Sequence, residues 1–133
     1  MNGKNVRCYS YKYDGSIKLS THFKVYEFRC KDNTDPIFIS MTLVNVLENI
    51  RKHFNKPVII NSAYRNPAKN GMSGGAKYSQ HMYGLAADIH IDGVSPVEIA
   101  KYAEMLMPHT GGIGIYDTFC HIDVRDEKSR WNG

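Results

Sequence analysis

The sequence predicts an α+β domain in which a small, largely antiparallel sheet has helices packed against it. Helical and strand-like segments are mixed along the chain, and the last two predicted strands are close in sequence, which favours antiparallel pairing. A chain of 133 residues can bury one hydrophobic core and has no room for a second. We therefore expect residues 1–133 to form a single domain.

The first part of the chain alternates short strand-like segments with turns. Arg7–Tyr13 and Ile17–Leu19 have strand character, and Asp14-Gly15 between them is a turn signal. The three tyrosines of the first segment would share one strand face. The apolar residues of segment 23–28 predict a short helix that packs on the core.

The middle of the chain predicts a helix, a buried strand and a long loop. Apolar residues recur at three- and four-residue steps from Ser40 to Phe54, which indicates a helix. Pro57–Ile60 is a breaker followed by a short buried strand. Ala63–Tyr78 contains proline and glycine turn signals and predicts a long loop. Long loops in small domains often carry function.

The last third predicts a strand, a helix and two further strands. Gly84–Ile91 has strand character, and the Ser95 capping box, with proline at the first helical position, begins a helix. Gly112–Tyr116 and Phe119–Val124 predict two strands that are joined by a tight turn.

Composition and charge exclude several classes of protein. The chain has 17 Lys and Arg against 13 Asp and Glu, a net charge of +4, and 42% hydrophobic residues, which is typical of a folded soluble domain. The basic residues are scattered, so we expect no nucleic-acid binding. No apolar run approaches the roughly 20 residues of a membrane span, and Met1–Arg7 lacks the apolar core of a signal peptide. We expect a monomer that is made in the cytoplasm without an export signal and inserts in no membrane.

The three cysteines do not form a recognisable framework. Cys8, Cys30 and Cys120 are an odd number without C-x-x-C spacing, which argues against a structural zinc site and a disulfide scaffold. We expect three reduced thiols, and a single Cys8–Cys30 bridge stays open as the alternative.

A metal centre is indicated by two histidines and an aspartate. His81, Asp88 and His121 would supply two nitrogens and one oxygen, which suits a catalytic zinc that leaves its fourth position to water. Strand alternation puts Asp123 on the same face as His121 and Cys120 on the opposite face, so the cysteine is a poor fourth ligand. The His–Asp spacing alone is a weak signal.

Several separated motifs resemble those of a known peptidase family. The segment from Ser79 to Asp88 resembles the S-x-H-x-x-G-x-A-x-D signature of zinc D-Ala-D-Ala carboxypeptidases and related murein endopeptidases, whose fold hedgehog signalling domains share. Further matches are Ser62–Arg65 to S-G-Y-R, Gly111–Tyr116 to G-G-I-G-x-Y and Phe119–Arg125 to F-V-H-V-D-V-R. Leu19–Phe28 is similar to the opening of the short, phage-associated branch. The resemblance covers about Leu19 to Trp131.

The resemblance implies a zinc peptidase mechanism. Zinc held by His81, Asp88 and His121 would activate a water that attacks a peptide carbonyl, and a carboxylate near the last histidine would take the proton. Thr118 stands where some relatives carry that base, so we favour Asp123, with Asp117 as the alternative. Asp123 could instead orient a ligand histidine.

Two further residues correspond to substrate-binding positions of the family. Arg65 matches an arginine whose planar fork suits a substrate carboxylate, and Ser79 matches the motif serine, which could contact substrate or form a turn. The expected function is a zinc-dependent peptidase that cuts peptidoglycan peptide stems at a D-alanine, as a carboxypeptidase or endopeptidase, at the bacterial cell wall and in a phage or prophage setting. The alternatives are a non-catalytic zinc-containing wall-binding module and an L-Ala–D-Glu endopeptidase.

Overall fold

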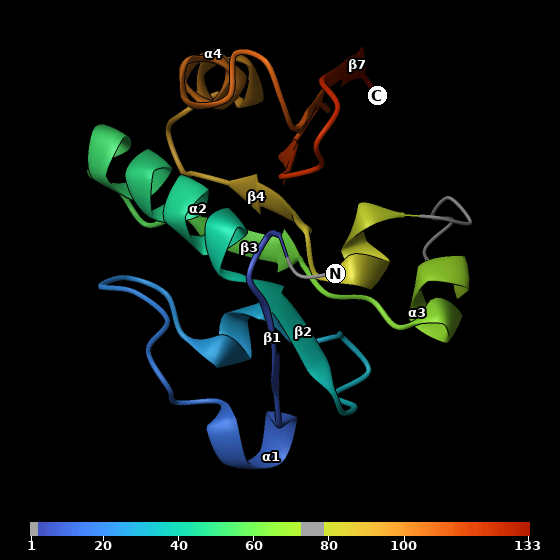
Figure 1. The fold of residues 1–133 in the computed structure, drawn as a ribbon. Helices are drawn as coiled ribbons and strands as arrows, with labels where there is room; N and C mark the ends of the chain where they lie inside the picture. Colours follow the sequence, from blue (N-terminus) through green and yellow to red (C-terminus); the bar gives the residue numbers. More distant parts are fainter. Residues whose placement is uncertain (1–2, 73–78) are drawn as a thin grey trace.

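A computed structural model describes residues 3–72 and 79–133 and confirms the α+β class (Figure 1). The strands are β1 (Val6–Tyr9), β2 (Ile37–Ser40), β3 (Ile59–Ser62), β4 (Ala86–His90), β5 (Gly112–Ile115), β6 (Cys120–Asp123) and β7 (Ser129–Asn132). The helices are α1 (Tyr11–Asp14), α2 (Met41–Phe54), α3 (Pro67–Met72) and α4 (Pro96–Leu106), with 3-10 turns η1 (Val25–Phe28) and η2 (Gln80–Tyr83).

The strands form two sheets, in which antiparallel pairing prevails as expected. The larger sheet has the order β3-β4-β6-β5-β7, and all its neighbours are antiparallel except the parallel pair β5–β7. The smaller sheet is the antiparallel pair β1–β2. The register of the central pair sets Asp88 opposite His121 and Ala86 opposite Asp123.

One core lies between the larger sheet and the helices. Helix α4 contacts β5, β6 and α2, and the apolar residues of these elements form one buried cluster with those of β2 and β4. Because side chains alternate along a strand, Ile89 and Ile122 enter this core while Asp88 and His121 point to the other face. The larger sheet thus has one apolar face for packing and one polar face for chemistry.

The two predicted long helices, α2 and α4, each begin at a serine cap, of which that at Ser95 was predicted. The Ser40 hydroxyl accepts a hydrogen bond from Leu43 N at the start of α2. Ser95 and Glu98 form the capping box that begins α4. These side chains satisfy amide groups that a helix start leaves without partners.

Two predictions for the first 20 residues are wrong. The strand at Arg7–Tyr13 ends at Tyr9, because Ser10 caps a helical turn at Tyr11–Asp14, so the three tyrosines do not share a strand face. Ile17–Leu19 is not a strand either; its one strand-like feature is an isolated bridge between Lys18 and Lys24.

The structure also contains elements that the sequence did not indicate. Strands β2 and β7 were not expected, and the predicted loop Ala63–Tyr78 includes helix α3; its residues 73–78 lie outside the described part. The predicted strand at Gly84–Ile91 begins at Ala86, because Gly84 has φ +74° and ends η2. All three cysteines are free thiols, so the Cys8–Cys30 alternative is wrong.

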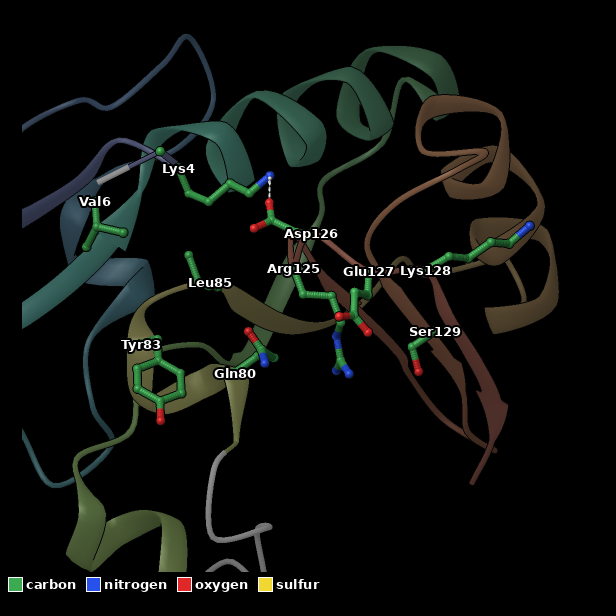
Figure 2. Close-up of a pocket in the computed structure, with 11 residues that line it drawn as sticks. Lys4, Val6, Gln80, Tyr83, Leu85, Arg125, Asp126, Glu127, Lys128 and Ser129 are labelled. Atoms are coloured by element: carbon green, nitrogen blue, oxygen red, sulfur yellow. Dashed lines mark ion pairs between the residues drawn. The ribbon is translucent and has the colours of Figure 1, made fainter. Parts of the chain in front are cut away.

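The N-terminal segment lies beside segment 125–129, and the two line a cavity of about 740 Å³ that we call the side cavity (Figure 2). An ion pair of 3.0 Å between Lys4 Nζ and Asp126 Oδ1 joins the two segments. Gln80, Tyr83 and Leu85 complete the lining. The residues of the predicted metal centre do not line this cavity, but Gln80 directly precedes one of them.

Candidate metal centre

His81 is held rigidly by the turn that carries it. The Ser79 hydroxyl accepts a hydrogen bond from His81 N, and Gly84 closes the turn in the left-handed conformation. A Cβ at Gly84 would lie 2.5 Å from the Phe38 carbonyl oxygen, so no larger residue fits. The Nδ1 of His81 is 2.7 Å from the Ala63 carbonyl, to which it donates, which leaves Nε2 to face Asp88.

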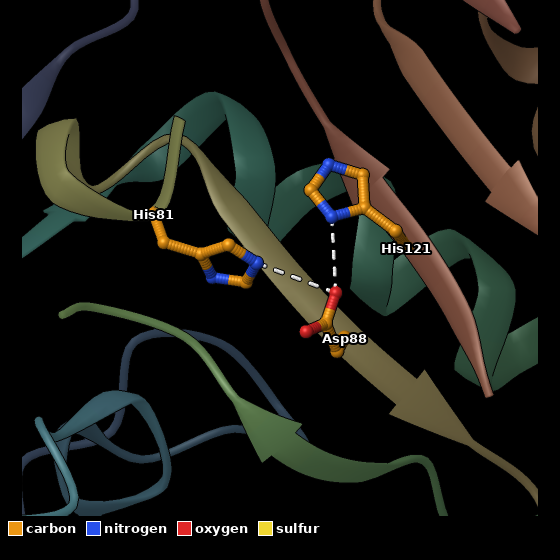
Figure 3. Close-up of side chains that lie close together, drawn as sticks. All are labelled: His81, Asp88 and His121. Atoms are coloured by element: carbon orange, nitrogen blue, oxygen red, sulfur yellow. Dashed lines mark hydrogen bonds and ion pairs between the residues drawn. The ribbon is translucent and has the colours of Figure 1, made fainter. Parts of the chain in front are cut away.

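Asp88 and His121 meet across the central strand pair. His121 Nδ1 is 3.0 Å from Asp88 Oδ1, and His81 Nε2 is 3.3 Å from the same oxygen. Figure 3 shows the two imidazoles pointing toward Asp88 from opposite sides. All three residues are buried.

The three side chains fit a zinc ion. One ligand atom from each residue lies within 4.8 Å of the other two. Two ligands on a tetrahedral zinc, each about 2.0–2.1 Å from it, are about 3.3 Å apart, which is close to the 3.0 and 3.3 Å between Asp88 Oδ1 and the two imidazole nitrogens. Two imidazole nitrogens and one carboxylate oxygen are also a donor set that leaves one position for water or substrate.

The electrostatics of the cluster keep the aspartate ionised. Burial by itself would raise the pKa of Asp88, but hydrogen bonds from His121 and His81 outweigh it and hold that pKa well below its ordinary value. Burial disfavours the charged form of His121, yet hydrogen bonds to Asp123 and Asp88 raise its pKa. Asp88 is therefore a carboxylate at neutral pH, which is the form that binds a metal.

Asp123 has no exposed surface, and both of its oxygens are hydrogen-bonded. Oδ2 accepts from His121 Nε2 at 2.7 Å and from Arg125 Nη2 at 2.7 Å. Oδ1 accepts from Gly112 N at 2.9 Å and from Arg125 Nε at 2.8 Å. Burial would raise the pKa of Asp123, but these bonds lower it well below its ordinary value. The His121 nitrogen bound to Asp123 is the one opposite the metal-facing nitrogen.

Arg65 lies at the metal centre and holds the second oxygen of Asp88. Its Nη2 is 3.2 Å from Asp88 Oδ2, while Nε and Nη1 donate to Ser62 Oγ and Asn70 Oδ1. The side chain is 14% exposed. Arg65 therefore lies beside Asp88, and its contact with substrate stays a prediction.

A comparison with known families decides the assignment. The model of the peptidase M15 family matches residues 21–123, which includes all three metal-ligand candidates. The chain belongs to the peptidase M15 family. Its relatives include the peptidoglycan L,D-endopeptidase MepK of Escherichia coli K12 and that of Shigella flexneri, each 34% identical over 115 residues, or 80% of this chain and 60% of the relative. The probable MepK of Haemophilus influenzae is 34% identical over 86 residues, covering 59% of this chain and 45% of the relative.

This M15 chain therefore spans three fifths or less of the length of the curated relatives it matches. The phage-associated branch that Leu19–Phe28 resembles has no counterpart among these relatives, which are bacterial. Among the described residues, no helix is long and apolar enough to cross a membrane.

The other carboxylate candidate lies away from the ligands. Asp117 is exposed in the turn between β5 and β6, and the described contacts of the metal centre do not include it. Cys120 points into the core, where burial raises the pKa of its thiol to about 12. It lies on the face opposite His121, as the strand alternation predicted, and is not part of the metal-ligand cluster.

Sequence reasoning assigned no role at this M15 site to two side chains, Arg125 and Trp131. Arg125 follows His121 and Asp123 at every second position, and this spacing was a usable signal for a third residue on the same face. The Trp131 ring lies 5.0 Å from the His121 ring, and its indole N–H donates to Tyr116 Oη. A Cβ at Gly114 would lie 2.5 Å from that ring, so the glycine makes room for it.

Proposed function

We propose that this chain is a zinc-dependent peptidase that hydrolyses an internal L,D peptide bond of bacterial peptidoglycan. The observation that carries the proposal is the convergence of His81, Asp88 and His121 within 4.8 Å in an M15 domain. The name of the MepK relatives supports an endopeptidase acting on an L,D bond. That bond class includes the L-Ala–D-Glu bond of the peptide stem, which the sequence left as an alternative.

The residues of this chain have distinct roles in the proposal. When bound, zinc would supply Lewis acidity that lowers the pKa of water and polarises the scissile carbonyl. His81, Asp88 and His121 would hold the zinc. The Ala63 carbonyl orients His81 by accepting a hydrogen bond from its Nδ1. Arg65 keeps the Asp88 carboxylate in place and offers its remaining N–H groups to a substrate carboxylate.

We further propose that Asp123 orients His121, which is the second of the two roles considered from the sequence. Oδ1 of Asp123 already accepts three hydrogen bonds and Oδ2 two, and the side chain has no exposed surface. A general base needs a lone pair within reach of the attacking water. Asp117, exposed in the adjoining turn, is then the carboxylate left to test as the base.

A test uses zinc-loaded protein, purified peptidoglycan and identification of the fragments by mass spectrometry. We expect cleavage that a chelator stops and added zinc restores, with products that carry a new end at an L,D bond. His81→Ala and Asp88→Asn should abolish it, whereas His109→Ala, at an exposed position, should not. Zinc binding with tight murein binding and no cleavage would favour the wall-binding module instead.

A second candidate activity is release of a terminal D-alanine. Arg65, 3.2 Å from Asp88, lies where it could meet the free carboxylate of such a substrate. A soluble stem pentapeptide ending in D-Ala-D-Ala distinguishes the two activities, because only a carboxypeptidase releases free D-alanine from it. The wall location, the phage setting and the monomeric state are parts of the same proposal, and the monomer is tested by sedimentation.

A further inference from the structure

The side cavity opens next to the metal centre, and its lining combines residues inside and outside the family match. Gln80 precedes the ligand His81, and Arg125 binds Asp123, which in turn binds His121. The pair Ala86–Asp123 is two residues along the strands from Asp88–His121, a distance of about 7 Å. Residues 3–6 and 125–129 of the lining lie outside the matched range 21–123. The cavity is thus within reach of a substrate bound at the metal centre.

Two cations of the cavity wall are already paired. Lys4 forms its ion pair with Asp126, seen at one rim of the cavity in Figure 2. Lys128 Nζ is 3.5 Å from Glu104 Oε2, away from the lining. Both ammonium groups therefore already have a carboxylate partner, although Glu104 also pairs with Arg130 Nε at 2.6 Å.

Arg125, although paired with Asp123, and Glu127 each keep polar capacity for a ligand. Arg125 is 30% exposed, and Asp123 engages its Nε and Nη2 but not Nη1. In the described part of the chain, Nη1 of Arg125 and the carboxylate of Glu127 have no hydrogen-bond or ion-pair partner. The cavity therefore presents one donor with positive charge and one acceptor with negative charge.

We propose that the side cavity binds a zwitterionic amino-acid centre of the peptide stem, with its carboxylate on Arg125 and its ammonium on Glu127. A single anion or cation would leave one of the two groups unmatched, whereas an amino-acid centre matches both. The volume of about 740 Å³ is in the range of small-ligand sites. The identity of the ligand as a peptide stem rests on the proposed function.

The test measures binding of three soluble stem tripeptides to the full chain by calorimetry, with zinc and after its removal. The first is L-Ala-D-Glu-diaminopimelate, whose side chain ends in such a centre. The second has lysine in place of diaminopimelate and so lacks only the carboxylate, and the third has an acetylated side-chain amine. We expect the second to bind about tenfold more weakly, as for a hydrogen bond between charged groups, and the third about threefold more weakly, as for an exposed ion pair.

Variants assign each contrast to its residue. Glu127→Gln should bind the acetylated and free amines equally and keep the contrast between diaminopimelate and lysine, while Arg125→Gln should lose the latter contrast. Asp92→Asn is the matched control, because this carboxylate is 91% exposed and does not line the cavity; it should behave as wild type. Circular dichroism checks that each variant folds.

The proposal is overturned when the three peptides bind the wild-type chain within twofold of one another, or when Asp92→Asn removes the amine contrast as Glu127→Gln does. The contrasts are scored on the protein from which zinc has been removed, where no peptide is hydrolysed, so this outcome is independent of hydrolysis. A chain that binds with these contrasts and cleaves nothing would refute the proposed peptidase function and leave the cavity assignment standing.

Discussion

At the scale of single residues, the His121–Asp123 pair determines which imidazole nitrogen faces the metal centre. Asp123 accepts from Nε2 at 2.7 Å, so Nδ1 points toward Asp88, 3.0 Å away. Arg125 fixes the carboxylate in turn with two parallel hydrogen bonds. Such outer partners set the orientation and basicity of a ligand histidine.

Asp123→Asn separates the orienting role from that of a base. The amide holds the imidazole less well, so zinc affinity should fall about 10–100-fold, while turnover at saturating zinc should fall less than about tenfold. Competition with a chelator measures the affinity, and peptide release measures the turnover. A general base contributes about 10²–10⁴-fold. A turnover loss of that size with normal zinc affinity would make Asp123 the base.

Asp117→Asn is the companion variant. As an exposed turn residue with no described contact to the ligands, Asp117 should leave zinc affinity unchanged when it is replaced. If it is the base, turnover at saturating zinc should fall about 10²–10⁴-fold. Wild-type turnover in this variant would exclude Asp117 from that role.

Gly114→Ala tests the close approach of Trp131 to the metal centre. The added methyl group would lie 2.5 Å from the indole ring, which must move away from His121. We expect a loss of about 1–3 kcal/mol in the free energy of unfolding, as for overpacking elsewhere, and a shifted fluorescence spectrum from this single tryptophan. Gly71→Ala, where a Cβ meets nothing within 4 Å, is the control. Unchanged fluorescence in Gly114→Ala would contradict the predicted displacement.

At the scale of elements, Glu48 fastens the segment before η1 to helix α2. It is buried, and its Oε1 accepts from Ser20 Oγ at 2.6 Å and from His22 N at 2.9 Å. Its Oε2 is 2.5 Å from His22 Nδ1. Burial would raise the pKa of Glu48, but these hydrogen bonds lower it. A charged residue on the apolar side of a helix is tolerated because its hydrogen bonds are satisfied.

Glu48→Gln should destabilise the fold by about 2 kcal/mol at pH 7, because the amide replaces charge-assisted hydrogen bonds. The pKa of Glu48 is lower in the folded state, so its contribution is complete above the ordinary carboxyl pKa and is lost as pH falls through the lowered one. Urea unfolding of both proteins from pH 7 to pH 3 should show the difference shrinking in the acid range. A difference that is constant down to pH 3 would contradict this assignment.

At the scale of the whole molecule, the metal centre joins η2, β4 and β6, which the chain reaches at residues 81, 88 and 121. A ligand that binds only the folded arrangement stabilises it by mass action, by about 4 kcal/mol at a thousand times its dissociation constant. We therefore expect zinc to raise the unfolding temperature by about 10 °C or more. His81→Ala should lose most of this shift, and His109→Ala should keep it. Equal shifts in the two variants would mean that zinc binds elsewhere.

The α+β class, the helices begun by Ser40 and Ser95, and the four strands β3 to β6 that carry or flank the ligands could all be predicted from the sequence. These follow from local physics, since periodicity and capping act over a few residues. The ligand set of His81, Asp88 and His121 could also be predicted. His81 lies in the turn that precedes β4, Asp88 lies on β4, and His121 lies on β6, the neighbouring strand in the sheet. Its motif spacing reflects that local geometry.

Strand pairing and hydrogen bonds between residues that are distant in sequence could be learned from the tertiary structure alone. Strands β2 and β7 are too short to show an alternation of apolar and polar residues, so the sequence did not indicate them. They form because β2 pairs with β1 and β7 pairs with β5, which are distant in sequence. In the same way, Gly112 N and Arg125 Nε donate hydrogen bonds to the Asp123 carboxylate and occupy its lone pairs. From the sequence alone this carboxylate could be interpreted as a general base. The residue type shows that an aspartate could act as a base or orient a histidine. Its burial and its hydrogen-bond donors, which depend on the tertiary structure, decide between these two roles.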